Sequence, residues 1–301
     1  MDRSQHWNPR GFQWDPRILH DFINGARYSD VDPSVMIGLI LLGIVAGIIG
    51  SLFGVGGGII FIPVLTIVYK LPAVEAAAIS LVGILSLSAG AASYYTEKKV
   101  ANVRLGLYLE IGTTIGAIMG AFIAGLIDQW IIFTIFAIFV IANGLRMLFS
   151  HGKDQGSTEG EHEFYTVDTK TGETIGYDLK HKAAGSAICF IAGAYSSVTG
   201  VGGGVIKVPV MNNFMGVPMK AATATSSFMI GLTAFCGAMV YFINGQIDLE
   251  FAACVAISSY IGMLIGTRIS RHFDTTSLKR YFAFVLFASA ISMLLKAGGI
   301  L

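Results

Sequence analysis

Residues 54–63 read GVGGGIIFIP, and residues 200–209 read GVGGGVIKVP. The two stretches lie 146 residues apart, and the likeness continues beyond them. Between residues 54 and 81, 12 of the 28 positions are identical to the position 146 residues later, where composition alone would give about two or three. The chain therefore contains an internal duplication.

The two copies lie in a strongly apolar chain. Of its 301 residues, 54% are hydrophobic and 13% are charged, and the mean hydropathy is +0.68. Residues 1–34 and 150–182 hold 20 of the 39 charged residues, which leaves 19 for the other 234. Because so few charges cannot cover a water-facing surface, we expect an all-α integral membrane protein that crosses the cell (plasma) membrane several times.

Apolar stretches divide the chain into two similar halves. Two of them, 55–70 and 201–217, are short, begin in a glycine run and contain a proline. The others are long enough to span a bilayer: 35–53, 73–95, 104–127, 129–149, 183–199, 219–243, 249–270 and 276–297. The predicted organisation is an N-terminal tail (1–34), a first membrane repeat (35–149), a hydrophilic connection (150–182) and a second membrane repeat (183–301).

The two polar regions have different expected structures. The tail combines aromatic side chains with a short amphipathic segment, which favours an interfacial belt on the bilayer surface; a frayed tail is the alternative. In the connection, YTVDTKTGETIGYDL alternates around a Thr-Gly turn and predicts a small β-hairpin.

The positive-inside rule indicates how the repeats are oriented. If each half crosses five times, 13 Lys and Arg residues lie on one face and 2 on the other; four crossings give 9 and 6, leaving out the tail and Lys207. Five crossings predict inverted repeats of about ten segments, with the connection in the cytoplasm. When the four arginines of the tail are included, the two arrangements tie at 13 to 6.

The glycine runs are the first candidate site. Glycine permits unwound backbone, which membrane proteins tolerate only where it is buried in protein or lines a cavity. Unpaired N–H groups at the start of a helix attract anions. The predicted anion-binding residues are Gly56, Gly57, Gly58, Gly202, Gly203 and Gly204. Close helix packing through small residues is the alternative.

Hydroxyl groups follow each glycine run. MKAATATSSFM places Thr225 and Ser226 near a helix start, and the first half retains Ser80. Such hydroxyls can donate to an anion without a buried charge, although hydroxyls in helices often bond to their own backbone instead.

Two charged residues lie within apolar segments. Lys207 follows the second glycine run, where the first half has Phe61; it can complement an anion or extend to the membrane surface. Glu110 lies about two turns inside its segment and is a candidate for proton coupling. Pairing with Arg104 or Lys98 is the alternative for Glu110.

Other functions find little support. The net charge of +1 offers no field for nucleic acid. Cys189, Cys236 and Cys254 lie in apolar runs without metal-ligand spacing, so we expect no metal site and no cofactor. An embedded enzyme would need an activated nucleophile or an acid-base pair, which these groups do not supply.

The duplicated GVGGGIIFIP and GVGGGVIKVP, together with the downstream AATATSS, resemble the sulfite exporter TauE/SafE family, also called the toluenesulfonate uptake permease family. The resemblance covers about residues 40–130 and 186–275. It implies transport of sulfur-containing anions such as sulfite or organosulfonates, in some members driven by protons. It implicates the glycines above with Pro63, Pro209, Thr225 and Ser226, whereas Ile79 departs from the pattern.

The leading hypothesis is a secondary transporter that moves a small sulfur oxyanion or sulfonate by alternating access. Its partners would be this anion and the lipid bilayer, and a homo-oligomer is compatible with this class. An anion channel would use similar parts. A membrane sensor or scaffold that acts through residues 150–182 is a further alternative.

Overall fold

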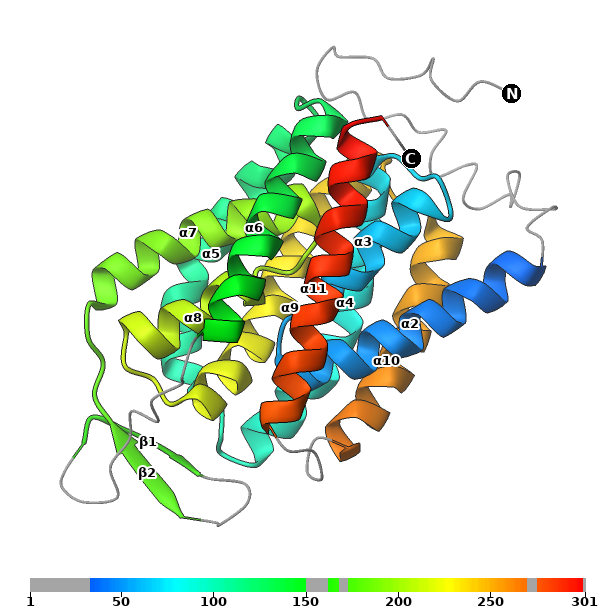
Figure 1. Cartoon of the computed structure of the whole chain (residues 1–301). Helices are drawn as coiled ribbons and strands as arrows, with labels where there is room; N and C mark the ends of the chain where they lie inside the picture. The colour runs from blue at the N-terminus through cyan, green and yellow to red at the C-terminus, as the bar shows by residue number, and fades with distance from the viewer. Residues whose placement is uncertain (1–32, 150–161, 168–172, 270–274, 300–301) are drawn as a thin grey trace.

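The computed structural model describes residues 33–149, 162–167, 173–269 and 275–299. It is a helical bundle with a two-stranded hairpin at one end (Figure 1). The predicted interfacial belt falls almost entirely within residues 1–32 and so lies outside the described residues.

The described helices follow the duplication. The first half contains α2 (Pro33–Phe53), α3 (Gly58–Ile67), α4 (Ala73–Glu97), α5 (Val103–Ala124) and α6 (Gln129–Phe149). The second half contains α7 (Lys182–Thr199), α8 (Gly204–Pro209), the π-helical turn η1 (Val210–Phe214), α9 (Met219–Ile243), α10 (Leu249–Ile269) and α11 (Thr275–Ala297). Helices α3 to α6 begin 146 residues before α8, α9, α10 and α11, the same shift that relates the sequences.

Prolines set the boundaries of the short segments. Pro72 and Pro218 directly precede α4 and α9, because a proline has no N–H to lose at a helix start. Pro63 lies inside α3, which continues to Ile67. Pro209 ends α8, and the chain widens into η1. The second half therefore has the more strongly broken helix.

Each glycine run reverses the chain. A Cβ on Gly57 would lie 2.8 Å from the Ala46 carbonyl oxygen, so the start of α3 lies beside the last turns of α2. The Tyr69 hydroxyl, beyond the end of α3, donates to the Val35 carbonyl at the start of α2 (3.4 Å). Helix α3 therefore runs back along α2.

Equivalent helices pack against each other in opposite directions. Ser88 of α4 donates to the carbonyl of Ser227 in α9. Leu81, which precedes Ser88 in α4, faces Gly237, which follows Ser227 in α9. Helices α4 and α9 therefore run antiparallel through the centre of the bundle.

The outer helix pairs pack through small residues. In α2 and α10, a Cβ on Gly47 would lie 2.3 Å from the Ser259 carbonyl oxygen. In the equivalent pair α5 and α7, a Cβ on Gly116 would lie 2.0 Å from the Phe190 carbonyl oxygen. Such close backbone approach is typical of helices that associate within membranes.

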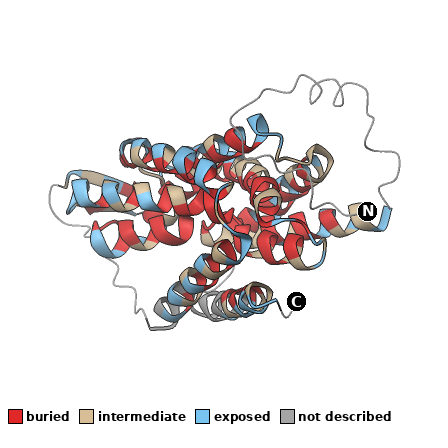
Figure 2. Cartoon of the chain, turned by 90° about the horizontal axis from the view of Figure 1, so that it is seen from above, coloured by how far each residue is buried: buried red, intermediate tan, exposed pale blue. Residues whose placement is uncertain are grey.

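The surface of the bundle is apolar as well as its interior. Buried residues gather in the centre and exposed ones on the outer helix faces (Figure 2). The outer faces still carry large hydrophobic side chains, for example Ile111, Ile115 and Phe122 of α5. Among the described residues, α2, α4, α5, α9 and α10 are long and apolar enough to cross a membrane. This is the all-α membrane protein that the composition predicts.

A β-hairpin packs on the end of the bundle. Strands β1 (Phe164–Val167) and β2 (Thr174–Tyr177) pair antiparallel and begin one residue before the stretch where the sequence predicts a hairpin. The Asn102 side-chain amide donates to the Tyr177 hydroxyl (2.8 Å), and the Thr166 hydroxyl donates to the Val100 carbonyl (3.0 Å). The hairpin is thus attached to the loop between α4 and α5.

Candidate functional site

The two glycine turns adopt the same left-handed backbone. Gly54, Gly56 and Gly57 have φ of +65°, +90° and +75°. Their equivalents Gly200, Gly202 and Gly203 have φ of +69°, +89° and +71°. Side chains with a Cβ disfavour these angles, so the repeated glycines are required by the backbone itself.

The turns meet at the boundary between the halves. A Cβ on Gly58 would lie 2.4 Å from the Gly200 carbonyl oxygen, and one on Gly204 would lie 2.5 Å from the Gly54 carbonyl oxygen. Of the predicted glycines, Gly58 and Gly204 therefore lie against the backbone of the opposite turn, whereas Gly57 and Gly203 lie against Ala46 and Ala192 of their own halves. Close packing is one reason for their presence.

The predicted serines each hold the turn of the opposite half. The Ser80 hydroxyl donates to the Gly200 carbonyl (2.6 Å), and the equivalent Ser226 hydroxyl donates to the Gly54 carbonyl (3.4 Å). The Thr225 hydroxyl accepts from the backbone N–H of Asn102 (2.9 Å). In this conformation all three predicted hydroxyls bond to the backbone of the protein.

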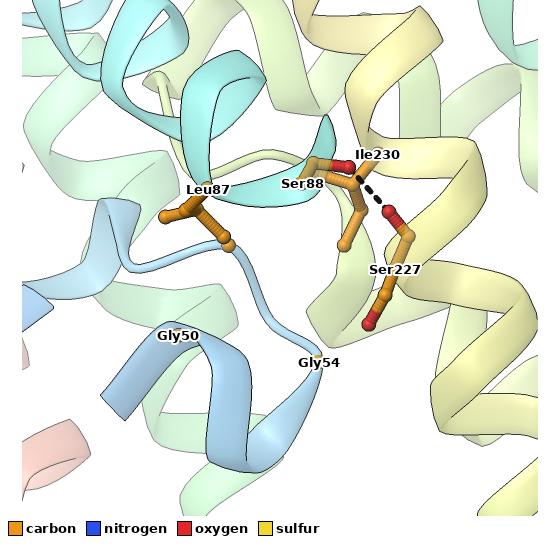
Figure 3. Close-up of a pocket in the computed structure, with 7 residues that line it drawn as sticks. Gly50, Gly54, Leu87, Ser88, Ser227 and Ile230 are labelled. Atoms are coloured by element: carbon orange, nitrogen blue, oxygen red, sulfur yellow. Dashed lines mark hydrogen bonds between the residues drawn. The ribbon is translucent and has the colours of Figure 1, made fainter. Parts of the chain in front are cut away.

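A narrow hollow lies beside the first glycine turn (Figure 3). Gly50, Gly54 and Gly56 form one side, and Ser88 and Ser227 contribute polar atoms to the other. It is too narrow to admit a water molecule. The first turn is therefore closed to a ligand in this conformation.

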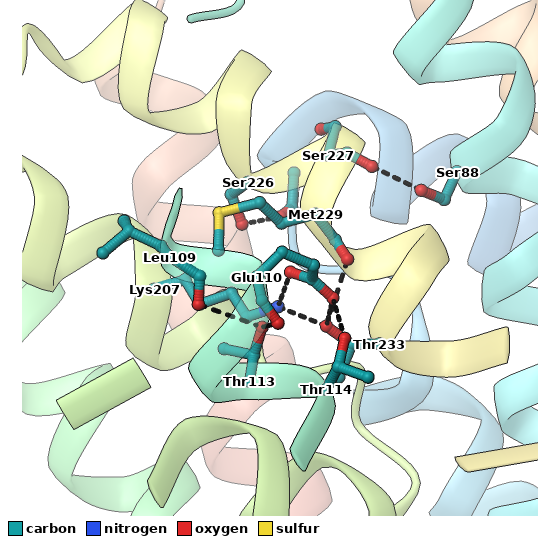
Figure 4. A network of polar contacts seen from close by, with 11 residues as sticks. Ser88, Leu109, Glu110, Thr113, Thr114, Lys207, Ser226, Ser227, Met229 and Thr233 are labelled. Atoms are coloured by element: carbon teal, nitrogen blue, oxygen red, sulfur yellow. Dashed lines mark hydrogen bonds and ion pairs between the residues drawn. The ribbon is translucent and has the colours of Figure 1, made fainter. Parts of the chain in front are cut away.

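A buried charged network lies where the two halves meet (Figure 4). Lys207 of α8 is fully buried, and Glu110 of α5 is 5% exposed. The Lys207 ammonium lies 3.4 Å from Glu110 Oε2 and donates to the Thr233 hydroxyl at 2.5 Å. The Thr233 oxygen in turn lies 2.6 Å from Glu110 Oε1, so the network joins α5, α8 and α9 across both halves.

The contacts in this network distinguish between the alternatives that the sequence left open for Lys207 and Glu110. Lys207 does not extend to the surface, because its side chain has no exposed area. Glu110 pairs with Lys207, whereas Arg104 lines a separate hollow near the hairpin together with Lys182. The two charged residues that the sequence singles out separately therefore form one ion pair.

Thr233 is the member of the network that the sequence analysis missed. A signal for it exists in the repeat, since Thr233 is equivalent to Leu87. The same shift pairs Lys207 with Phe61 and Glu110 with Ala256. Comparing the halves for polar residues opposite apolar ones would have identified all three positions.

The comparison with known families now identifies the protein class. Residues 39–293 match the family described as "Sulfite exporter TauE/SafE". The chain belongs to the TauE/SafE sulfite exporter family. The match spans both glycine turns and all three residues of the charged network, so these features lie within the family domain.

Several relatives of this TauE/SafE protein are named as transporters. A probable membrane transporter protein of Bacillus subtilis is 28% identical over 82% of this chain and 93% of its own length. A probable membrane transporter protein of Methanocaldococcus jannaschii is 26% identical over 85% of this chain and 94% of its own. "Sulfite exporter TauE/SafE family protein 5" of Arabidopsis thaliana is 28% identical over 36% of this chain and 24% of its own.

No solved structure matches the chain. The family and its named relatives are membrane transporters and not enzymes. This TauE/SafE protein is accordingly a multi-pass membrane transporter.

Proposed function

We propose that this TauE/SafE protein carries small sulfur-containing anions, such as sulfite or organosulfonates, across the cell membrane by alternating access. The observation that carries this proposal is the fully buried Lys207, one turn beyond the second glycine turn. A buried cation in a membrane protein is costly unless it has a partner or a function. Its fixed positive charge suits an anionic cargo.

The same proposal includes an inverted repeat of ten segments. It is supported by the antiparallel packing of the equivalent helices α4 and α9 and by the return of α3 along α2. When α3 is counted as a membrane crossing, each half crosses the membrane five times. Because five is an odd number of crossings, the second half begins on the opposite side of the membrane and is inverted relative to the first. Inverted halves that rock about a central site are a common basis of alternating access.

The proposed binding groups lie on both halves. The first N–H groups of α3 and α8, at Gly58 and Gly204, have no partner within their helices and can face an oxyanion. Ser80, Thr225 and Ser226 would exchange their present backbone partners for the anion as the halves move. Glu110 is the proposed proton-coupling residue.

Flux through proteoliposomes tests the function. We expect purified protein to move radiolabelled sulfite or methanesulfonate with saturating kinetics and with acceleration by unlabelled anion on the far side. A channel would give neither saturation at low concentration nor trans-acceleration. Absence of flux for every sulfur anion would overturn the proposed substrate.

The decisive variant is Lys207→Met. We expect at least a tenfold loss of sulfite flux, because a neutral side chain cannot balance a buried anion. Lys98→Met is the matched control, since Lys98 is exposed in the α4–α5 loop, and it should keep flux within about twofold of wild type. A folded Lys207→Met protein with normal flux would contradict the role of Lys207.

A further inference from the structure

The charged network has no counterpart at the equivalent positions of the repeat. The contact of Ser80 with Gly200 is repeated by Ser226 with Gly54. By contrast, the residues of the network have apolar equivalents. Phe61 stands for Lys207, Ala256 for Glu110 and Leu87 for Thr233. The equivalent positions of the repeat are therefore all apolar, two in the first half and one in the second, so a role beyond packing has to account for the ion pair.

The ion pair itself is loosely made. Its nitrogen and oxygen are 3.4 Å apart, whereas charge-assisted hydrogen bonds are usually about 2.7–2.9 Å long. Lys207 reaches Glu110 mainly through Thr233, at 2.5 Å and 2.6 Å. A carboxylate held in this way can be exchanged for another anion without the loss of a tight direct contact.

Thr233 can serve the network in two protonation states. Its hydroxyl lies 2.6 Å from Glu110 Oε1 and 3.0 Å from the Met229 carbonyl oxygen, and it has one proton for these two acceptors. If Glu110 is protonated, the Thr233 hydroxyl can turn to Met229 and accept from the carboxylic acid. No buried polar group is then left without a partner.

We propose that the Glu110 carboxylate is a built-in occupant of the anion site, which the transported anion displaces from Lys207 and Thr233 while Glu110 takes up one proton. This inference rests on the proposed function and extends the proposed binding site from the glycine turns to Lys207 and Thr233. Glu110 is then both the competitor of the substrate and the coupling group.

Charge balance requires the proton. At rest, the ammonium of Lys207 and the carboxylate of Glu110 sum to zero. When a monovalent anion binds Lys207, an ionised Glu110 would leave one net negative charge buried in the membrane, which is strongly unfavourable. One proton on Glu110 restores a neutral site, so anion and proton cross together in a ratio of one to one.

The groups around Glu110 leave it as the acceptor of that proton. Helix α7 contributes Cys189, and α9 contributes Cys236, both close enough to interact electrostatically with Glu110. Helix α8 contributes Lys207, and α5 itself contributes Thr114, whose hydroxyl is 3.4 Å from Oε1. The thiols are already protonated near neutral pH, so the carboxylate is the group that can gain a proton.

Calorimetry of anion binding tests this directly. Sulfite and methanesulfonate are titrated into the purified full-length protein in two buffers of different ionisation enthalpy, which reports the protons taken up. Methanesulfonate is the deciding probe when it binds, because its own charge is constant in this pH range. We expect about one proton per anion for wild type, and an affinity that tightens about tenfold for each pH unit lowered while Glu110 is ionised.

Two variants sharpen the test. Glu110→Gln should bind the probe with no proton uptake and little dependence on pH, and in vesicles it should equilibrate the anion without proton-driven accumulation. Glu250→Gln, which changes a partly exposed carboxylate at the start of α10, should retain the uptake of one proton.

The outcomes separate this inference from the proposed function. Failure of wild type to bind either anion would overturn both. Binding by wild type without proton uptake would overturn this inference alone and leave anion transport standing. Because that measurement uses wild type, the inference is decided even if Glu110→Gln does not fold. Proton uptake that persists in a folded Glu110→Gln protein would assign the proton to another group and would also overturn it.

Discussion

At the residue scale, the protein contains buried charged side chains that are tolerated because their neighbours balance the charge. Lys207 and Glu110 are each costly in a membrane, and together they form a neutral unit completed by Thr233. Removal of one member leaves an uncompensated charge, whereas removal of both leaves a cavity that apolar groups can fill.

The stability of matched variants should follow from this difference. We expect Lys207→Phe alone to destabilise the protein by about 3–5 kcal/mol, because Glu110 is left unpaired. The double variant Lys207→Phe with Glu110→Ala introduces the residue types found at the equivalent positions Phe61 and Ala256, and it should recover most of this loss. Thermal unfolding in detergent provides the measurement. A double variant as unstable as the two single changes added together would show that the residues do not act as a pair.

At the scale of elements, the broken helices combine two requirements that a sequence pattern cannot separate. The glycines allow positive φ, and they also permit the two turns to approach within van der Waals contact. A functional loss on glycine substitution therefore does not by itself demonstrate anion binding. Comparison with a glycine outside the turns is needed to measure the packing contribution.

Alanine substitutions can make that comparison. Gly58→Ala and Gly204→Ala should each destabilise the protein by about 1–3 kcal/mol through overpacking, since each Cβ would lie within 2.5 Å of a carbonyl oxygen of the opposite turn. Gly125→Ala is the control, because the nearest atoms are 3.7 Å away and φ is −68°. If all three variants unfold at the same temperature, the turns are not tightly packed.

At the scale of the whole molecule, the antiparallel packing of α4 and α9 fixes how the halves relate. Antiparallel equivalent helices place equivalent loops at opposite ends of the bundle. The loop after α4 is at the hairpin end, so its counterpart after α9 should be at the other end. In the proposed inverted repeat, these two ends face opposite sides of the membrane.

Cysteine labelling of equivalent loops tests this topology. Lys98 and Asn244 are equivalent by the 146-residue shift, and both are exposed. In a background without Cys189, Cys236 and Cys254, we expect Lys98→Cys and Asn244→Cys to react with an impermeant reagent from opposite sides of the membrane. Labelling of both from the same side would overturn the inverted repeat.

The sequence by itself determined the membrane class, the duplication, the helix boundaries to within a few residues and the residues that carry buried charge. These follow from composition, length and a fixed shift, because a lipid environment imposes apolar helices of set length. It also determined the family, through the repeated GVGGG and the proline after it.

The tertiary structure alone decided which residues meet. Glu110 and Lys207 are 97 residues apart, and each has nearer charges along the chain, so sequence spacing favoured Arg104 or Lys98 for Glu110. The pairing arises because α5 packs beside α8 and α9, which brings one helix of the first half against two of the second. Ser80 and Ser226 likewise reach the opposite turn only because the halves interlock. Contacts between segments distant in the chain depend on how helices cross, and no local pattern encodes that.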